Sequence, residues 1–191
     1  MNVITYETRE QLTDKLVTDM VELSRGDGIG HGTGTWANAD ERDPSRDYWG
    51  VFGKSAVTGV FPNPEVVSWD GYGRVHAVDN GADELLGFLA LQIRDTPKAK
   101  LPMRDVFIEA AGVGEDRAHD VVGLLVREAL THKENTDLNA CVFGTFLEAS
   151  VFGSILQDTH GWGSSPGWHE GVLSLIEDVD HRDERYRILT S

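Results

Sequence analysis

The chain has 191 residues with 32 acidic and 17 basic side chains, so its formal net charge is -15 with histidine neutral. A hydrophobic content of 40% is ordinary for a globular fold and excludes wholesale disorder. No apolar run approaches the roughly 18–20 residues of a membrane-spanning helix, and the first residues lack the basic and apolar regions of a secretory signal. We expect one domain over residues 1–191, located in the cytoplasm and not bound to a membrane.

Cysteine and histidine usage predicts no metal site. The single cysteine, Cys141, excludes an internal disulfide and a cysteine-rich metal centre. None of the seven histidines stands at the spacing of a common metal-binding motif. The net charge of -15 also argues against nucleic acid as a partner, because binding to a phosphate backbone needs a basic face.

The N-terminal segment predicts a strand over residues 3–6 and an amphipathic helix over residues 9–23. Thr8 and Gln11 have the spacing of a capping box, in which two side chains satisfy unpaired backbone donors at a helix start. Leucine and methionine then recur every three or four residues on one face. The glycine-rich segment that follows predicts a mobile loop over residues 26–47, with a lid over a ligand and a phosphate cradle as the alternatives.

A β-rich middle follows, in five short runs of β-branched and aromatic residues separated by glycine, proline, asparagine and aspartate. The runs cover residues 47–53, 56–61, 65–69, 73–78 and 84–93. Asp70-Gly71 and Asn80-Gly81 are typical of the tight turns of β-hairpins. We therefore expect a meander of strands in this part of the chain.

The last part of the chain alternates between strands and helices. We expect strands over residues 103–113, 139–146 and 171–179, with helices over residues 116–132 and 148–160 between them. Gly161 is the expected end of the second helix. This alternation after a meander predicts an α/β (α+β) fold in which a mixed sheet carries helices on both faces.

The turn between the first of these strands and its helix offers an anion site. A helix that starts directly after a strand presents unpaired backbone N–H groups and the positive end of its dipole, which suits a pyrophosphate. Arg117 and His119 would add donors there, whereas Glu115, Asp116 and Asp120 would repel an anion. The structural alternative is that Asp116 simply caps the helix.

The run RAHDVVGLL, residues 117–125, resembles the RGxGIGxxLL motif of the GNAT superfamily of N-acetyltransferases. The resemblance covers residues 85–177 in the order of elements and extends more loosely over the whole chain. It implies a single GNAT-like domain with a mostly antiparallel sheet, and acetyl-CoA or another acyl-CoA as the cofactor. Asp120 stands where the family has a small residue. The residues that the resemblance assigns to the cofactor here are Val113, Arg117, Ala118, His119, Val121 and Val122.

A second resemblance lies in SVFGSILQDTHGW, residues 150–162, which has the outline of the family's Asn-x-x-Ala…Leu-Tyr-x-x-x-Gly-Phe motif. Ser150 stands at the asparagine position and is a further implied cofactor residue. Gln157 stands at the catalytic position of the tyrosine that protonates the leaving thiolate, although glutamine has no such proton to give. Glu109 lies where some members keep a base for the acceptor amine, and a carboxylate without a role is the alternative there.

Together these patterns predict an acyl-CoA-dependent N-acyltransferase that acts on an amine of a small molecule or a protein. The first alternative is a non-catalytic GNAT-like scaffold that serves as a binding or assembly protein, which Ala118, Asp120 and Gln157 favour. The second is a divergent transferase that modifies nucleic-acid bases, against which the net charge argues. A separation between the strands at residues 103–113 and 139–146 would indicate a cofactor cleft.

Overall fold

The computed structural model describes residues 1–25, 27, 47–62, 71–82, 84–97, 102–166 and 171–178. Its strands are β1 (Asn2–Tyr6), β2 (Gly71–Asp79), β3 (Leu85–Thr96), β4 (Met103–Val113), β5 (Asn139–Leu147), β6 (Gly163–Pro166) and β7 (Val172–Ile176). Its helices are the short 3-10 helix η1 (Arg9–Gln11), α1 (Asp14–Ser24), α3 (Tyr48–Thr58), α4 (Ala118–Glu134) and α5 (Val151–His160). The predicted strand over residues 65–69 lies outside the described residues. So do Asp70 of the first predicted turn and the predicted loop over residues 26–47, apart from Asp27 and Asp47.

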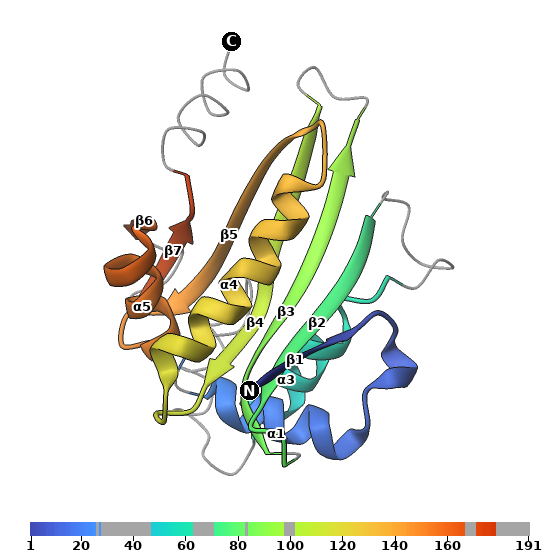
Figure 1. Ribbon diagram of the computed structural model, residues 1–191, viewed down its shortest axis with the longest axis vertical. Coiled ribbons are helices and arrows are strands. Elements are labelled where there is room, and N and C mark those ends of the chain that lie inside the picture. The colour runs from blue at the N-terminus through green and yellow to red at the C-terminus, as the bar shows by residue number, and fades with distance from the viewer. Residues whose placement is uncertain are drawn as a thin grey trace.

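The strands of the described residues form one sheet in the order β1-β2-β3-β4-β5-β7-β6 (Figure 1). Neighbouring strands pair antiparallel, except that β4 and β5 pair parallel. The chain passes between these two strands through α4, which crosses one face of the sheet (Figure 1). The predicted mixed, mostly antiparallel sheet is confirmed.

Two helical layers cover the two faces of the sheet (Figure 1). On one face α4 and α5 bury apolar side chains such as Val121 and Phe152. On the other face α1 and α3 bury a second set, which includes Met20 and Val57. Gly87 of β3 lets α4 approach closely, because a Cβ atom there would lie 2.6 Å from Cγ1 of Val121. The predicted helices on both faces are confirmed.

Residues 47–53 and 56–61 do not form the predicted strands, because most of them belong to α3. Asp47 starts this helix, since its side chain accepts the backbone N–H of Gly50 at 2.8 Å. Ala56 and Val57 follow Trp49 by seven and eight residues, which is two turns of a helix. The three side chains are therefore on one face of α3, and all three are buried. Aromatic and β-branched residues that favour a strand are here the apolar face of a helix.

The single helix predicted over residues 9–23 is divided into η1 and α1. The predicted capping box is present but belongs to η1, where the side chain of Gln11 accepts the backbone N–H of Thr8 at 3.1 Å. Leu12 then adopts an extended conformation. Thr13 starts α1 by accepting the N–H of Leu16 at 3.2 Å. The break therefore coincides with a second N-cap, Thr13, which the helical spacing of apolar residues did not indicate.

The second half of the chain follows the predicted elements. The predicted strands over residues 103–113 and 139–146 are found as β4 and β5, and β7 lies within the third. The second predicted helix ends as expected, because Gly161 follows α5 in the left-handed conformation at φ 70°. Gly81 is left-handed at φ 83° in the turn from β2 to β3. Both predicted helices start later than expected, α4 at Ala118 and α5 at Val151. The N-cap of α4 is Arg117, so the alternative that Asp116 caps this helix is wrong.

Candidate functional site

Glu109 is a β-bulge within β4. Leu91 of β3 pairs with Ile108 and Ala90 pairs with Ala110, so Glu109 is the extra residue between them. A bulge interrupts the regular alternation of side chains and re-aims the residue that forms it. The predicted base therefore lies at an irregular point of the sheet.

β4 and β5 separate directly after this bulge. Their last parallel pair joins Ile108 to Gly144. Beyond it β5 continues against β7 as far as Leu147. Among the described residues, no strand pairs with residues 109–113 of β4 on the β5 side, and we call this separation the β4–β5 gap. A separation of these two strands is the feature expected at a cofactor cleft.

The backbone N–H of Val113 points into this gap. The N–H of the next residue, Gly114, donates to Leu86 on β3 at 2.9 Å. Successive residues of a strand direct their N–H groups to opposite edges, so Val113 turns its N–H toward β5. There the carboxylate of Asp27 accepts it, with 3.1 Å between the nitrogen and Oδ2.

Asp27, just after α1, bridges the gap. Its second oxygen, Oδ1, accepts the hydroxyl of Ser150 at 2.9 Å and the N–H of Phe152 at 2.7 Å. The residue is only 2% exposed. Burial raises the pKa of Asp27, and its hydrogen bonds to Phe152, Ser150 and Val113 oppose that rise. One buried carboxylate thus joins Val113 and Ser150, two of the predicted cofactor residues.

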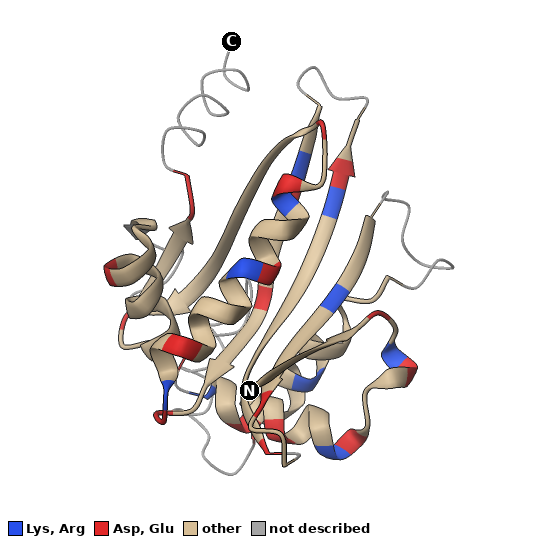
Figure 2. Cartoon of the chain, viewed as in Figure 1, with Lys and Arg blue, Asp and Glu red and all other residues tan. Residues whose placement is uncertain are grey.

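The N-terminus of α4 has no side-chain cap. Arg117 is the N-cap residue, in the left-handed conformation at φ 59°, and its side chain makes no capping hydrogen bond. The first N–H groups of a helix have no acceptor within the helix, so those of Ala118, His119 and Asp120 face the turn. Acidic residues lie in the turn where β4 runs into α4 and in the first part of α4, with Arg117 between them (Figure 2). The turn therefore combines backbone N–H donors with nearby acidic residues.

The other predicted cofactor residues fall into an exposed and a buried group. Arg117 is exposed and pairs with Asp120 at 3.0 Å. His119 contacts α5 through Thr159, with 3.3 Å between Nδ1 and Oγ1. The residues whose side chains are buried against the sheet are Ala118, Val121 and Val122.

Burial changes the titration of Glu109. Burial raises the pKa of Glu109 to about 7, and nearby Arg94 opposes that rise. Arg94 also donates a hydrogen bond to the side chain of Gln92, which is buried in β3. At neutral pH the Glu109 carboxyl is divided between its two protonation states, which suits a group that takes and returns a proton.

The predicted residues around α5 have different partners. Ser150 is the N-cap of α5, and its hydroxyl accepts the N–H of Gly153 at 2.8 Å while it donates to Asp27. Gln157 is half-buried, and its backbone carbonyl accepts the N–H of Gly161 at 3.2 Å. The structure thus links Ser150 to Val113 through hydrogen bonds to Asp27. The other two predicted residues, Gln157 on α5 and Glu109 on β4, are not part of this hydrogen-bond network.

A second polar cluster, partly buried, links β1, β2 and α4. The Nε2 atoms of His76 and His132 lie 3.3 Å apart. Their Nδ1 atoms contact Thr5 Oγ1 at 3.0 Å and the Tyr72 hydroxyl at 3.1 Å. Burial lowers the pKa of each histidine to about 4, and the positive charge of Arg74 adds to the effect. Sequence patterns did not single out this pair, because its members are 56 residues apart.

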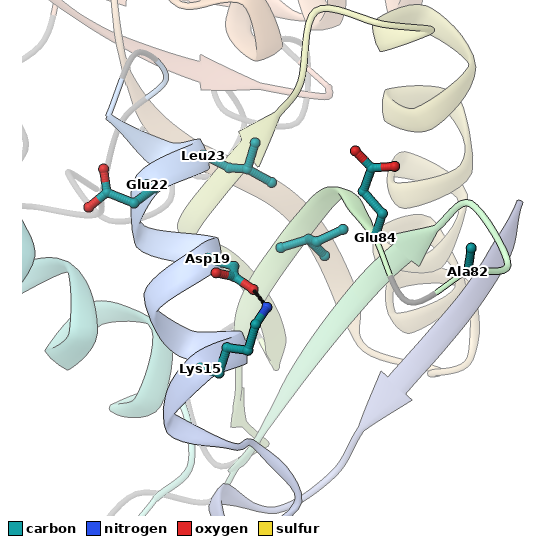
Figure 3. A pocket seen from close by; sticks show the side chains of 7 residues that line it. Lys15, Asp19, Glu22, Leu23, Ala82 and Glu84 are labelled. Carbon is teal, nitrogen blue, oxygen red and sulfur yellow. Dashed lines mark hydrogen bonds and ion pairs between the residues drawn. The ribbon is translucent and has the colours of Figure 1, made fainter.

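An open groove of about 540 Å³ lies between α1 and the β2–β3 turn (Figure 3). It is lined by Lys15, Asp19, Glu22, Leu23, Ala82, Glu84 and Leu85. Asp19 pairs with Lys15 at 2.6 Å, and Glu22 pairs with Arg25 at 2.8 Å. None of the predicted site residues lines this groove, so we place the candidate site in the gap after Glu109.

Two further sequence expectations concern metals and membranes. Among the residues that the structure describes, no group of three or more histidine, cysteine, aspartate or glutamate side chains is placed to hold a metal ion. In the same part of the chain, no helix is both long and apolar enough to cross a membrane. The single cysteine, Cys141, is buried in β5.

Similarity to known proteins lies in the fold. No family model matches the sequence, and no curated protein matches it. Three solved structures each align with 93% of this chain. The first is an acyl-CoA N-acyltransferase from Pseudomonas aeruginosa, with 14% identity, a TM-score of 0.50 and 99% of that chain covered.

The second is the PaiA N-acetyltransferase from Thermoplasma acidophilum in complex with coenzyme A, with 12% identity, a TM-score of 0.52 and 99% of that chain covered. The third is "histone acetyltransferase HPA2 and related acetyltransferase" from Corynebacterium glutamicum, with 13% identity, a TM-score of 0.51 and 96% covered. The chain therefore has the fold of the GNAT N-acetyltransferases, as the resemblance in its sequence implied.

Proposed function

We propose that the protein is an acyl-CoA-dependent N-acyltransferase that acylates the amine of a small molecule or a protein. The observation that carries the proposal is the gap between β4 and β5, which opens directly after the bulge at Glu109. The Val113 N–H faces this gap, and the N-terminus of α4 follows four residues later. The acyltransferases that share the fold support the same reading.

The residues at the start of α4 fit the diphosphate of an acyl-CoA. The amides of Ala118, His119 and Asp120 and the helix dipole favour an anion at this turn. Ala118 and Val122 stand at small-residue positions of the family motif, and both side chains are buried in the core between α4 and the sheet. The carboxylates of Glu115, Asp116 and Asp120 oppose an anion there, and that of Asp120 also engages Arg117.

The chain's own groups then supply positioning and proton transfer. A bound acyl-CoA contributes an activated thioester carbonyl, which a backbone donor such as the Val113 N–H would polarise. Glu109, directly or through water, takes the proton of the amine as the new N–C bond forms and the C–S bond breaks. Gln157 has no titratable proton, so the proton held by Glu109 is the one that balances the leaving thiolate. Most of the rate gain comes from holding amine and thioester together.

The test is release of free thiol from acetyl-CoA in the presence of a panel of primary amines. We expect turnover with at least one amine, and a loss of about 100-fold or more in Glu109→Gln. Glu134→Gln is the matched control, because Glu134 is exposed at the far end of α4. Equal rates for the wild type and Glu109→Gln would remove Glu109 from the mechanism.

The second candidate is a GNAT-like scaffold without catalysis. Two observations favour it. The Val113 N–H already donates to Asp27, and the Arg117 side chain already pairs with Asp120. Such a scaffold would copurify with a macromolecular partner, and Asp120→Gly would leave that contact unchanged. Absence of acetyl-CoA binding together with a stable partner complex would decide for this candidate.

A further inference from the structure

Asp27 is attached to both sides of the gap through its backbone and its side chain. Its own N–H donates to the carbonyl of Ser24 in α1 at 3.0 Å, and its carbonyl accepts the N–H of Leu147 at the end of β5 at 2.9 Å. The residue is 2% exposed. Its position is therefore fixed by α1 on one side and by β5 on the other.

The two carboxylate oxygens of Asp27 serve different sides of the gap. Oδ2 accepts the N–H of Val113 on β4. Oδ1 accepts both donors at the start of α5, the Ser150 hydroxyl and the Phe152 N–H. The α5 side supplies two hydrogen bonds and the positive end of a helix dipole, whereas the β4 side supplies a single hydrogen bond. The contact with Val113 is thus the easier one to give up.

We propose that Asp27 is the gate residue of the acyl-CoA cleft: its carboxylate holds the Val113 N–H and must release it before a ligand carbonyl can bind there. This inference rests on the proposed function. One N–H donor serves one acceptor well, so the carboxylate and a ligand compete for it directly. Oδ1 keeps both of its α5 donors when Oδ2 leaves Val113, so release does not require α5 to move.

The competing explanation is a fixed spacer that holds the cleft in shape. The two roles predict opposite changes in affinity when the contact with Val113 is lost: a gate raises the affinity for the ligand, and a spacer lowers it.

Asp27→Asn separates the two roles. The amide oxygen of the asparagine replaces Oδ1 opposite the two α5 donors, and its NH2 group then faces the Val113 N–H, which it cannot accept. Ser150→Ala is the matched control, since it removes a hydrogen bond to the same carboxylate on the α5 side and retains the one to Val113.

The first measurement needs no ligand. Amide hydrogen exchange at Val113 is expected to be slow in the wild type and in Ser150→Ala, and at least tenfold faster in Asp27→Asn. Equal exchange in all three proteins would show that Asp27 does not hold this N–H, and would overturn the gate.

The second measurement is a calorimetric titration of the same proteins with acetyl-CoA, which carries the thioester carbonyl that competes for the Val113 N–H. We expect Asp27→Asn to bind about tenfold more tightly than the wild type, and Ser150→Ala to bind no more tightly. Binding to the wild type with equal or weaker binding to Asp27→Asn would overturn the gate and leave the proposed function intact. Binding to none of the proteins would overturn both.

A third measurement uses the wild type alone and does not depend on the folding of a variant. In a structure of the wild-type protein with acetyl-CoA, Oδ2 of Asp27 should lie beyond hydrogen-bond distance of the Val113 nitrogen. Bound acetyl-CoA beside an intact contact between Asp27 and Val113 would overturn the proposal.

Discussion

The carboxylate of Asp27 accepts the backbone N–H of Val113 at 3.1 Å, across 86 residues of sequence. Through its other oxygen the same carboxylate holds Ser150 and the first turn of α5. Elements on both sides of the β4–β5 gap therefore depend on one buried side chain.

Asp27→Ala is expected to lower the free energy of unfolding by about 3 kcal/mol or more. The substitution leaves three buried donors without their acceptor, and each unsatisfied donor costs about 1–3 kcal/mol. Chemical denaturation measures the change. Asp137→Ala, at an exposed position, is the control and should change stability by less than about 0.5 kcal/mol. A similar small loss in both variants would contradict the network around Asp27.

The pKa of Glu109, raised to about 7 by burial, predicts the pH dependence of catalysis. A base acts in its deprotonated form, so kcat/KM should fall about tenfold per pH unit below 7 and level off above it. The assay should use an acceptor amine whose own pKa lies well below 7, so that its titration does not contribute. A profile that is flat between pH 5 and 8 would count against Glu109 as the base.

Asp120→Ala should strengthen the binding of coenzyme A about fivefold. It removes a carboxylate from the anion site, an effect of about 1 kcal/mol near a protein surface, and it frees Arg117 from its pair. Calorimetry checks this against Glu134→Ala, which changes the net charge equally at the other end of α4. Equal gains in both variants would assign the effect to net charge instead of to the turn.

The fold was largely predictable from the sequence because its signals are local. β4 shows apolar residues on both faces of a buried strand, and Gly161 ends α5 where a left-handed residue is needed. α3 was missed because Trp49 and its β-branched neighbours favour a strand, and only the Asp47 cap indicates a helix.

The site was less predictable because its geometry depends on contacts distant in sequence. The position of Glu109 in β4 was visible, but its bulge comes from the register against β3. Asp27 lies in a glycine-rich segment, and nothing local indicates that it meets Val113 and Phe152, 86 and 125 residues away.

The buried pair His76 and His132 predicts a loss of stability in acid. Both folded-state pKa values lie near 4, below the ordinary 6.5. The unfolded chain therefore takes up protons first as the pH falls from 6.5 to 4, and stability decreases over that range. We expect on the order of 2 kcal/mol per histidine, after a discount for the partial exposure of His132.

Unfolding of the wild type and of His132→Gln over pH 4–7 measures this loss. Glu109 has a raised pKa and therefore contributes a slope of the opposite sign between about 4.5 and 7, so the difference between the two curves is the relevant quantity. His132→Gln should lose less stability in acid than the wild type. Parallel curves would show that the pKa of His132 is the same in the folded and unfolded states.

The central claim is that an acyl-CoA binds between β4 and β5 at the start of α4. Amide chemical shifts of the wild-type protein during a titration with acetyl-CoA test it most directly. The account predicts the largest changes at Val113 and at the first amides of α4, over residues 118–120. No change at millimolar acetyl-CoA, or changes confined to other parts of the chain, would contradict it.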